Sequence, residues 1–433
     1  MITLESLYQL YLKHPVVCTD TRKITKNCLF FALRGDNFDA NTFAAQALEN
    51  GAAFAILDNS QFAKDERCIL VSDALTTLQD LARYHRKQLN IPVIGLTGSN
   101  GKTTTKELIK AVLAEKYRVF ATQGNLNNHI GVPLSILSLP LDVEIAVIEM
   151  GANHQKEIEM LCEIAQPTHG LITNVGMAHL DGFGGFEGVK KGKGELYAYL
   201  KKTNGCTFLY HDNPYLIEMS KVAALHKIVF YGTAKDNRIS GKLTHADPLI
   251  HLEWSNTTTT FNAKANLTGT YNFENILAAI CIGDFFEIAA EAINKGLADY
   301  IPVNNRSQLT KTGHNMVICD FYNANPSSMS VALTNLKDLS SNHKAVIIGD
   351  MFELGNEAAE QHQHIVALCN GLNFEVQLFI GENFFAHKEQ HEGKFFKTRD
   401  EAGIYLAENP IKDSLVLLKG SRGMALEQLL SLL

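Results

Sequence analysis

The chain has 433 residues, of which 46% are hydrophobic and 20% charged, and its formal net charge at pH 7 is −7. This length gives room for two to four domains with full hydrophobic cores. The acidic balance gives no indication of the basic stripe that a nucleic-acid partner would require. The first 15 residues lack the basic start and unbroken apolar run of a signal peptide, and no later run approaches membrane-spanning length, so we expect no membrane insertion.

Eight cysteines are scattered along the chain without CxxC pairs, mostly inside apolar runs such as "NCLFFAL" and "AAICIGDFF". This usage favours buried free thiols in a reducing compartment over a disulfide or metal framework. We therefore expect a cytoplasmic protein.

Short apolar runs alternate with helical patterns from one end of the chain to the other. They fall into three clusters: 28–33, 52–58 and 68–73; then 92–98, 118–122, 144–150 and 170–176; then 315–321, 344–350, 377–382 and 414–420. Alternating strands and helices predict an α/β fold, and near-continuous apolar strands predict mostly parallel sheets covered on both faces. We expect three domains, over residues 1–88, 89–302 and 303–433, with a β-rich elaboration of the second at 205–265.

Residues 95–109, "GLTGSNGKTTTKELI", carry the clearest chemical signal. A strand, a glycine-rich turn and a helix follow one another, which predicts a cradle of backbone N–H groups for phosphate at a helix N-terminus. The predicted nucleotide residues here are Gly98, Ser99, Asn100, Gly101, Lys102, Thr103 and Thr104. Lys102 would hold the outer phosphates and the Thr103 hydroxyl would bind Mg²⁺. The strict Walker spacing fails, so a purely structural glycine turn is the alternative.

Two further polar residues follow predicted strands. Glu149 ends "EIAVIEM", and His179 follows "GLITNVG". Because the carboxyl ends of parallel strands share one edge of a sheet, we expect both side chains to lie at the nucleotide crevice and to hold metal or phosphate. Capping or packing roles are the alternative.

Four further stretches carry recognisable motifs: "QGNLNNHIGVPLSIL" (123–137), "YNFENILAA" (271–279), "DFYNANPSSM" (320–329) and "LKGSRGM" (418–424). Together with the stretches above, they resemble the Mur ligase family of ATP-dependent enzymes that extend the peptidoglycan precursor. The resemblance covers nearly the whole chain. It implies a small N-terminal α/β domain for UDP, a central P-loop-type ATPase domain, and a C-terminal Rossmann-like domain that closes over the site. Within the family, the motifs are most similar to those of members that add D-alanyl-D-alanine to UDP-N-acetylmuramoyl-tripeptide.

The resemblance also implies site residues. Those on the UDP side and at the two peptide substrates are Asp20, Thr21, Arg22, Arg34, Gly35, Asp39, Asn125, Asn127, Asn128, Asn323, Asn325, Lys419, Ser421 and Arg422. Those that reach ATP, besides the glycine-rich turn, are Asn272, Asn275, Arg306 and Asp320.

The lysine fourteen residues after His179, Lys193, matches the one that the family converts to a carbamate. A carbamate formed from CO₂ offers two oxygens and a negative charge, and so would help to hold a second Mg²⁺. A plain ammonium beside phosphate, or a solvated basic face formed with Lys190 and Lys191, are the alternatives. The predicted metal residues are therefore Thr103, Glu149, His179 and Lys193, and the predicted catalytic ones are Lys102, Glu149, His179 and Lys193.

The implied reaction is an amide ligation driven by ATP through an acyl phosphate. Two other functions stay open from the sequence: a Mur ligase that adds the third amino acid to UDP-N-acetylmuramoyl-dipeptide, and a P-loop NTPase without ligase activity. The resemblance favours a monomer.

Overall fold

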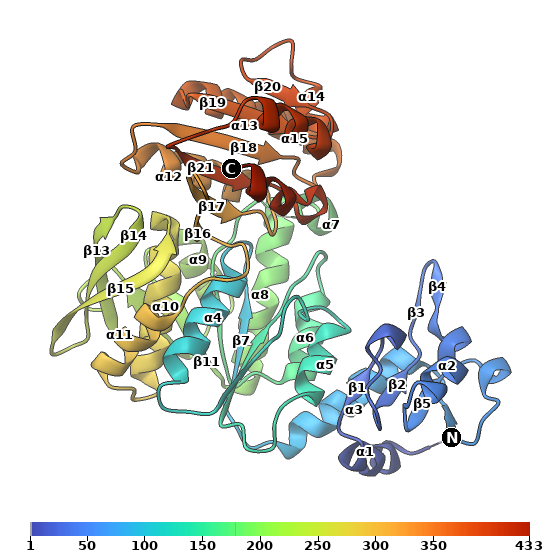
Figure 1. Ribbon diagram of the computed structural model, residues 1–433. Helices are drawn as coiled ribbons and strands as arrows, with labels where there is room; N and C mark the ends of the chain where they lie inside the picture. Colours follow the sequence, from blue (N-terminus) through green and yellow to red (C-terminus); the bar gives the residue numbers. More distant parts are fainter. Residues whose placement is uncertain (1, 178) are drawn as a thin grey trace.

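The computed structural model describes residues 2–177 and 179–433. Three separate sheets follow one another along the chain, each with its own helices (Figure 1). This mixed α/β architecture with mostly parallel strands confirms the predicted fold class.

The N-terminal sheet has four parallel strands in the order β1-β2-β5-β6. Its elements are α1 (Leu4–Lys13), β1 (Val17–Cys18), β2 (Leu29–Phe31), α2 (Ala44–Glu49), β5 (Phe54–Leu57), β6 (Cys68–Leu70) and α3 (Ala74–Gln88). A short antiparallel hairpin, β3 (Arg34–Gly35) and β4 (Phe38–Asp39), projects from this body (Figure 1).

The central sheet has nine strands in the order β15-β14-β13-β12-β11-β10-β7-β9-β8. The strands are β7 (Val93–Thr97), β8 (Val119–Ala121), β9 (Ile145–Glu149), β10 (His169–Ile172), β11 (Cys206–Tyr210), β12 (Lys227–Gly232), β13 (Ile239–Ala246), β14 (Leu249–Ser255) and β15 (Thr260–Thr268). All pairs from β8 to β13 are parallel, and β14 and β15 join as antiparallel strands. The antiparallel end accounts for the predicted β-rich elaboration.

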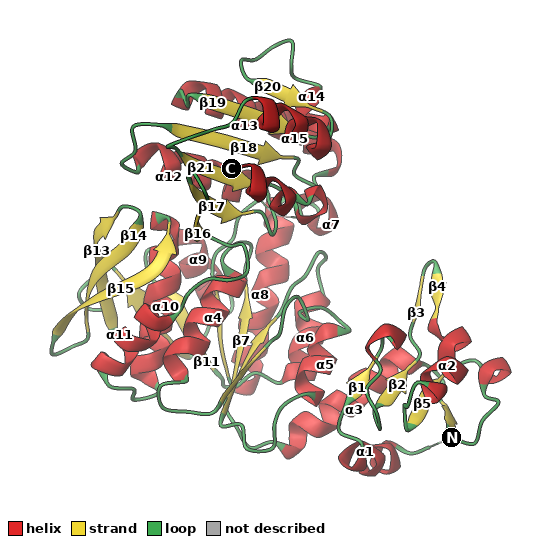
Figure 2. Ribbon diagram, viewed as in Figure 1, coloured by secondary structure: helices red, strands yellow, loops and turns green. Residues whose placement is uncertain are grey.

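Helices cover both faces of the central sheet (Figure 2). They are α4 (Lys102–Leu113), α5 (Gly131–Leu137), α6 (Glu157–Ala165), α7 (Leu180–Phe183), α8 (Phe186–Thr203), α9 (Pro214–Val222), α10 (Phe273–Phe285) and α11 (Ala290–Asp299). Residues of α5, α6 and α8 pack in one apolar cluster, and those of α4, α10 and α11 pack in another. Every residue of β7 and β9 is buried, as expected for strands covered on both sides.

The C-terminal sheet has the order β16-β17-β21-β18-β19-β20, and only β16 is antiparallel. Its elements are β16 (Gln308–Lys311), β17 (Met316–Asp320), α12 (Pro326–Asp338), β18 (Lys344–Gly349), α13 (Ala358–Leu372), β19 (Val376–Ile380), α14 (Glu382–Phe385), β20 (Lys394–Phe396), α15 (Arg399–Glu408) and β21 (Leu415–Lys419). Apolar clusters lie on its two faces. In Figure 1 this body sits above the carboxyl ends of the central strands.

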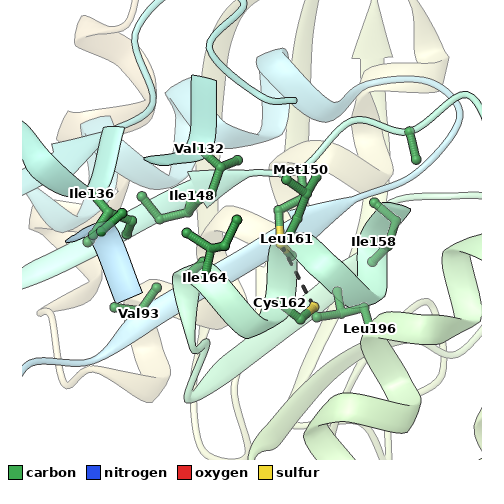
Figure 3. Packing of buried hydrophobic residues seen from close by; sticks show 14 of the residues in the cluster. Val93, Val132, Ile136, Ile148, Met150, Ile158, Leu161, Cys162, Ile164 and Leu196 are labelled. Atoms are coloured by element: carbon green, nitrogen blue, oxygen red, sulfur yellow. Dashed lines mark hydrogen bonds between the residues drawn. The ribbon is translucent and has the colours of Figure 1, made fainter. Parts of the chain in front are cut away.

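The N-terminal and central bodies share one apolar cluster. It runs from Leu78 of α3 to the residues around Ile148 and Leu161 in Figure 3. Arg86, at the end of α3, is buried and has no carboxylate partner. Its guanidinium instead donates to four backbone carbonyls, including that of Ala165 at 3.0 Å. The two bodies are thus joined by both apolar packing and hydrogen bonds.

All eight cysteines carry free thiols, and six of them are buried, as the sequence predicted. Within the described residues, none of the helices combines the length and apolarity needed to cross a bilayer.

Candidate active site

A cleft of about 720 Å³ lies between the carboxyl edge of the central sheet and the C-terminal body. The central body contributes the glycine-rich loop, residues around 124–129 and 149–153, the segment that follows β10, and residues 271–275. The C-terminal body contributes residues at 306–307 and 320–331, Glu353 and Lys419. The cleft therefore gathers most of the residues that the sequence predicted for nucleotide and metal.

The glycine-rich loop between β7 and α4 has the turn that its sequence predicted. Gly98 has φ +147°, and a Cβ built there would lie 2.0 Å from Thr173 Oγ1. Gly101, at φ +76°, is the N-cap of α4. A Cβ on Gly101 would lie 2.8 Å from Asn275 Oδ1, so both positions combine a positive φ with a close neighbour and favour glycine.

The loop does not present all its N–H groups to the cleft. Ser99 N donates to Asn174 O and Asn100 N donates to Asn174 Oδ1, each at 3.0 Å. The N–H groups of Ser99 and Asn100 are therefore not free to join the predicted cradle for phosphate. The first-turn N–H groups of α4 remain as an anion-binding end.

Lys102 folds back on the loop. Its Nζ donates to Gly98 O at 2.7 Å and to Ser99 O at 3.2 Å. Burial lowers the pKa of Lys102 to about 8, while the carboxylate of Glu149 acts in the opposite direction. Lys102 therefore keeps its ammonium form at neutral pH, at the loop where an anionic ligand would bind.

Glu149 lies at the end of β9, as predicted, and is buried. Its Oε1 accepts from Asn127 Nδ2 at 2.8 Å and from the Thr103 hydroxyl at 3.3 Å. Its Oε2 is buried without a hydrogen-bond partner. A carboxylate oxygen left unpaired beside a hydroxyl is a donor set of the kind that Mg²⁺ takes, so these residues fit a magnesium ion.

His179 and Lys193 lie near this group but are held by other partners. Nδ1 of His179 is 2.7 Å from Glu353 Oε2 of the C-terminal body. Burial lowers the pKa of His179, and the charges of Lys102 and Lys193 act in the same direction. Within residues 2–177 and 179–433, no three His, Cys, Asp or Glu side chains are grouped closely enough to hold a metal. Of the predicted metal residues, Thr103 and Glu149 contact each other directly, whereas His179 contacts Glu353 and Lys193 contacts Ala152 O.

Lys193 is buried in α8, with its Nζ 3.3 Å from Ala152 O and 5.0 Å from the centre of the Phe183 ring. Burial lowers the pKa of Lys193 to about 7, and the charge of Lys102 acts in the same direction. A solvated basic face is therefore wrong for Lys193. Burial thus favours the neutral amine of Lys193 over the ammonium.

The two predicted adenine-side asparagines line the cleft, but their side chains bond within the protein. Asn275 accepts from Thr105 and donates to Asn272, which in turn donates to Thr268 O and Ser307 Oγ. Between them, Glu274 borders the cleft and accepts from Asn174 Nδ2 at 3.1 Å. Burial raises the pKa of Glu274 to about 7.

The C-terminal body brings several charged side chains to the cleft, among them Arg306, Asp320 and Lys419, and carries Arg422 beside it. Asp320, at the end of β17, pairs with Lys419, at the end of β21, at 2.6 Å. The Tyr322 ring lies against two guanidinium groups, that of Arg306 at 4.0 Å and that of Arg422 at 5.1 Å.

The remaining predicted residues are only in part at the cleft. Thr104, Asn125, Asn128, Asn323 and Asn325 line it, whereas Ser421 does not and accepts from Phe352 N. The residues predicted for UDP lie on the N-terminal body and line no part of the cleft: Asp20, Thr21, Arg22, Arg34, Gly35 and Asp39. There, Asp20 pairs with Arg22 and Arg34 pairs with Asp58, each near 2.8 Å.

Several cleft residues were not predicted, among them Asn174, Glu274, Tyr322, Ser327 and Glu353. Asn174 and Tyr322 closely follow strands that end at the cleft, which is a signal that the sequence carried. Ser327 and Glu353 lie at the cleft because the C-terminal body docks on the central body. No local sequence pattern predicts that docking.

Family models match most of this architecture. Residues 96–283 match the Mur ligase middle domain, and residues 305–422 match the Mur ligase, glutamate ligase domain. The UDP-N-acetylmuramoyl-tripeptide–D-alanyl-D-alanine ligase of Bacillus subtilis is 36% identical over 424 residues, which cover 95% of this chain and 92% of the relative. The Escherichia coli enzyme of the same name is 33% identical, with 95% and 92% covered.

Solved structures agree with these matches. A crystal structure of MurF from Acinetobacter baumannii superposes with a TM-score of 0.87 at 29% identity, covering 97% of this chain and 96% of that one. The MurF ligase of Thermotoga maritima in complex with ADP superposes with a TM-score of 0.85 at 27% identity, covering 97% of each chain. With two family models spanning more than half of its length and relatives matched from end to end, the chain belongs to the Mur ligase family.

Proposed function

We propose that this chain is an ATP-dependent ligase that joins D-alanyl-D-alanine to UDP-N-acetylmuramoyl-tripeptide, in the synthesis of the peptidoglycan precursor. The observation that carries the proposal is the match, over 95% of the chain, to curated ligases of that name. ATP supplies the driving force, since amide formation from a carboxylate and an amine is uphill in water.

The first step brings a carboxylate against the γ-phosphate, and both are anions. The ammonium of Lys102 and the N-terminus of α4 offset this repulsion where the charge is concentrated. The carboxylate oxygen attacks phosphorus, ADP leaves, and an acyl phosphate forms. The amine then attacks the acyl carbon, and phosphate leaves with one oxygen of the original carboxylate.

The second step requires an amine held close to the acyl carbon and shielded from water. The C-terminal body would serve this need, since Asp320, Lys419 and Arg306 line the same cleft as Lys102. Arg422, whose guanidinium lies against the same Tyr322 ring as that of Arg306, would hold the anionic end of the dipeptide.

Thr103 and Glu149 would hold Mg²⁺, with Asn127 keeping the carboxylate oriented. Bound there, the ion would neutralise phosphate charge. The unpaired Oε2 of Glu149 supports this role.

Lys193 is proposed to carry a carbamate. CO₂ adds to a neutral amine, and burial together with Lys102 makes the neutral form of Lys193 abundant at pH 7. The product, an anion near Lys102 and His179, would complete a second magnesium site with His179. The nearby ammonium of Lys102 would favour such an anion, whereas Glu157 and Glu195 favour the ammonium form of Lys193.

Residues 1–88 are proposed as the UDP-binding domain, 89–302 as the ATP-binding domain and 303–433 as the domain that receives the amine. The exposed Arg22 and Arg34 of the first domain are suited to an anionic diphosphate. We expect a cytoplasmic monomer without nucleic-acid partners, in keeping with the free thiols.

The test is ADP release measured with the UDP-muramoyl-tripeptide and D-alanyl-D-alanine, together and singly. We expect release only with both, and a UDP-linked pentapeptide by mass spectrometry. Ligation of a diamino acid to the UDP-muramoyl-dipeptide would identify the third-residue ligase, and release without either acceptor would identify a simple NTPase.

A further inference from the structure

Three polar side chains form a closed ring of hydrogen bonds between the glycine-rich loop and the C-terminal body. Asn100 Nδ2 donates to Ser327 Oγ at 3.0 Å, Ser327 Oγ donates to Asn325 Oδ1 at 2.9 Å, and Asn325 Nδ2 donates to Asn100 Oδ1 at 2.9 Å. Both ends of the Asn100 amide are thus used by residues more than 220 positions away along the chain.

The central body fixes the direction of the Asn100 side chain. The Asn100 N–H donates to Asn174, and its carbonyl accepts from Thr173 Oγ1 at 2.6 Å and from Asn174 Nδ2 at 3.2 Å. Gly176 leaves room for the partner, because a Cβ there would lie 3.1 Å from Ser327 Oγ. Asn100 therefore presents a pre-oriented amide to whatever docks above the loop.

The C-terminal body presents its half of the ring with similar rigidity. Asn325 is the N-cap of α12, where it forms a capping box with Ser328 and is followed by Pro326 at the first helical position. The same Oδ1 that accepts from Ser327 also accepts from Ser328 N at 2.9 Å. Loss of the contact with Ser327 would therefore also change the N-cap of α12, the helix that lines the cleft.

Other contacts between the two bodies avoid the loop. Thr270 N donates to Asn335, Ser340 N donates to Asp247, and Glu353 meets His179. Among the hydrogen bonds of the described residues, those of Asn100 alone join the glycine-rich loop to the C-terminal body.

We infer that Asn100, Ser327 and Asn325 form a docking latch, which couples the position of the C-terminal body, where the amine is received, to the nucleotide loop. This inference rests on the proposed function and deepens it. It assigns positioning roles to Asn100 and Asn325, which the sequence placed among direct ATP and substrate contacts. With the latch formed, the acyl phosphate meets the amine; without it, the domain leaves the loop and water reaches the acyl phosphate.

Ser327→Ala tests the latch, because it removes the hydroxyl that bonds to both Asn100 and Asn325 and leaves the glycine-rich loop unaltered. Ser330→Ala is the matched control, since Ser330 lies in the same helix and its hydroxyl bonds only to Pro326 O. Two readouts separate positioning from ligand contact: the ratio of ADP released to amide formed, and the affinity for ATP alone. Circular dichroism checks that each variant is folded.

We expect the wild-type ratio to be one to one. Ser327→Ala should raise it to about two or more and lower kcat/KM for the dipeptide about tenfold, as expected for the loss of two neutral hydrogen bonds. Its affinity for ATP should stay within about twofold, because Ser327 lies on the C-terminal body and the glycine-rich loop is unchanged. Asn100→Ala should lower kcat/KM similarly, and the double variant should be no worse than the poorer single variant.

Wild-type protein that forms no amide would overturn the proposed function itself. If the wild type ligates but Ser327→Ala behaves like Ser330→Ala, the latch is wrong and the proposed function stands. Additive losses in the double variant would also reject the latch, since they would mean that Asn100 and Ser327 act on the ligand separately.

Discussion

Glu274→Gln should stabilise the central domain at alkaline pH and have little effect at acidic pH. Burial raises the pKa of Glu274 to about 7, against an ordinary value of 4.5. Between these values the folded protein keeps a proton that the unfolded chain has released, so stability falls as pH rises through this window. At about 1.4 kcal/mol per pH unit, the full cost above pH 7 is on the order of 3 kcal/mol.

The expected gain is smaller than this limit. Glu274 borders an open cleft, where water screens the charge, so we expect Glu274→Gln to raise the free energy of unfolding by about 1–2 kcal/mol at pH 8.5. At pH 4, below both pKa values, the gain should be close to zero, because the glutamate is then largely protonated in the folded and in the unfolded state. Glutamine keeps the carbonyl oxygen that accepts from Asn174.

The assay is denaturant unfolding followed by tryptophan fluorescence at the two pH values. Trp254 is the single tryptophan of the chain and is buried in β14, in the same sheet as the nucleotide loop, so it reports on the central domain. Glu291→Gln, at an exposed glutamate of the same domain, is the control. A gain of equal size at both pH values, or the same trend in the control, would refute the reasoning.

Other substitutions test other parts of the structure. Lys102→Ala should lower kcat by at least ~10²-fold in steady-state ADP release while the protein stays folded, because it removes the ammonium at the transferring phosphate; near-normal turnover would make the loop a structural turn. Lys193→Ala should abolish most activity, and a short carboxylic acid should restore part of it, since its oxygens replace those of a carbamate; rescue by a small amine alone would show that Lys193 acts as a cation. Arg86→Met should lower the free energy of unfolding by roughly 2–4 kcal/mol, measured by circular dichroism, because one buried and three partly buried carbonyls lose their donor. Arg83→Met, which breaks a partly exposed ion pair with Asp80, should cost under ~1 kcal/mol; equal losses would contradict the role of Arg86.

Much of the fold was predictable because its signals are local. The buried strands β7, β9, β18 and β21 are continuous apolar runs, which only a sheet covered on both faces accommodates. The turn at Gly98 was equally readable, since a glycine-rich stretch between a strand and a helix has few other conformations. Glu149 could be placed at the cleft because it ends a parallel strand.

What the sequence did not reveal depends on which elements become neighbours. Asn174 takes two N–H groups of the nucleotide loop only because β10 pairs beside β7. Glu353 meets His179, and Ser327 meets Asn100, only because the C-terminal body docks on the central one. These contacts depend on the docked tertiary structure, which hydrophobic periodicity does not specify.

The central claim is that the chain activates a carboxylate by phosphorylation, and an oxygen-transfer measurement tests it directly. The UDP-muramoyl-tripeptide is labelled with ¹⁸O in its reacting carboxylate and ligated with ATP and D-alanyl-D-alanine, and the released phosphate is analysed by mass spectrometry. An acyl phosphate predicts one ¹⁸O atom in each phosphate released from a fully labelled carboxylate. Unlabelled phosphate from a reaction that consumes ATP would contradict the account, because the γ-phosphate would then have passed to water and never to the carboxylate.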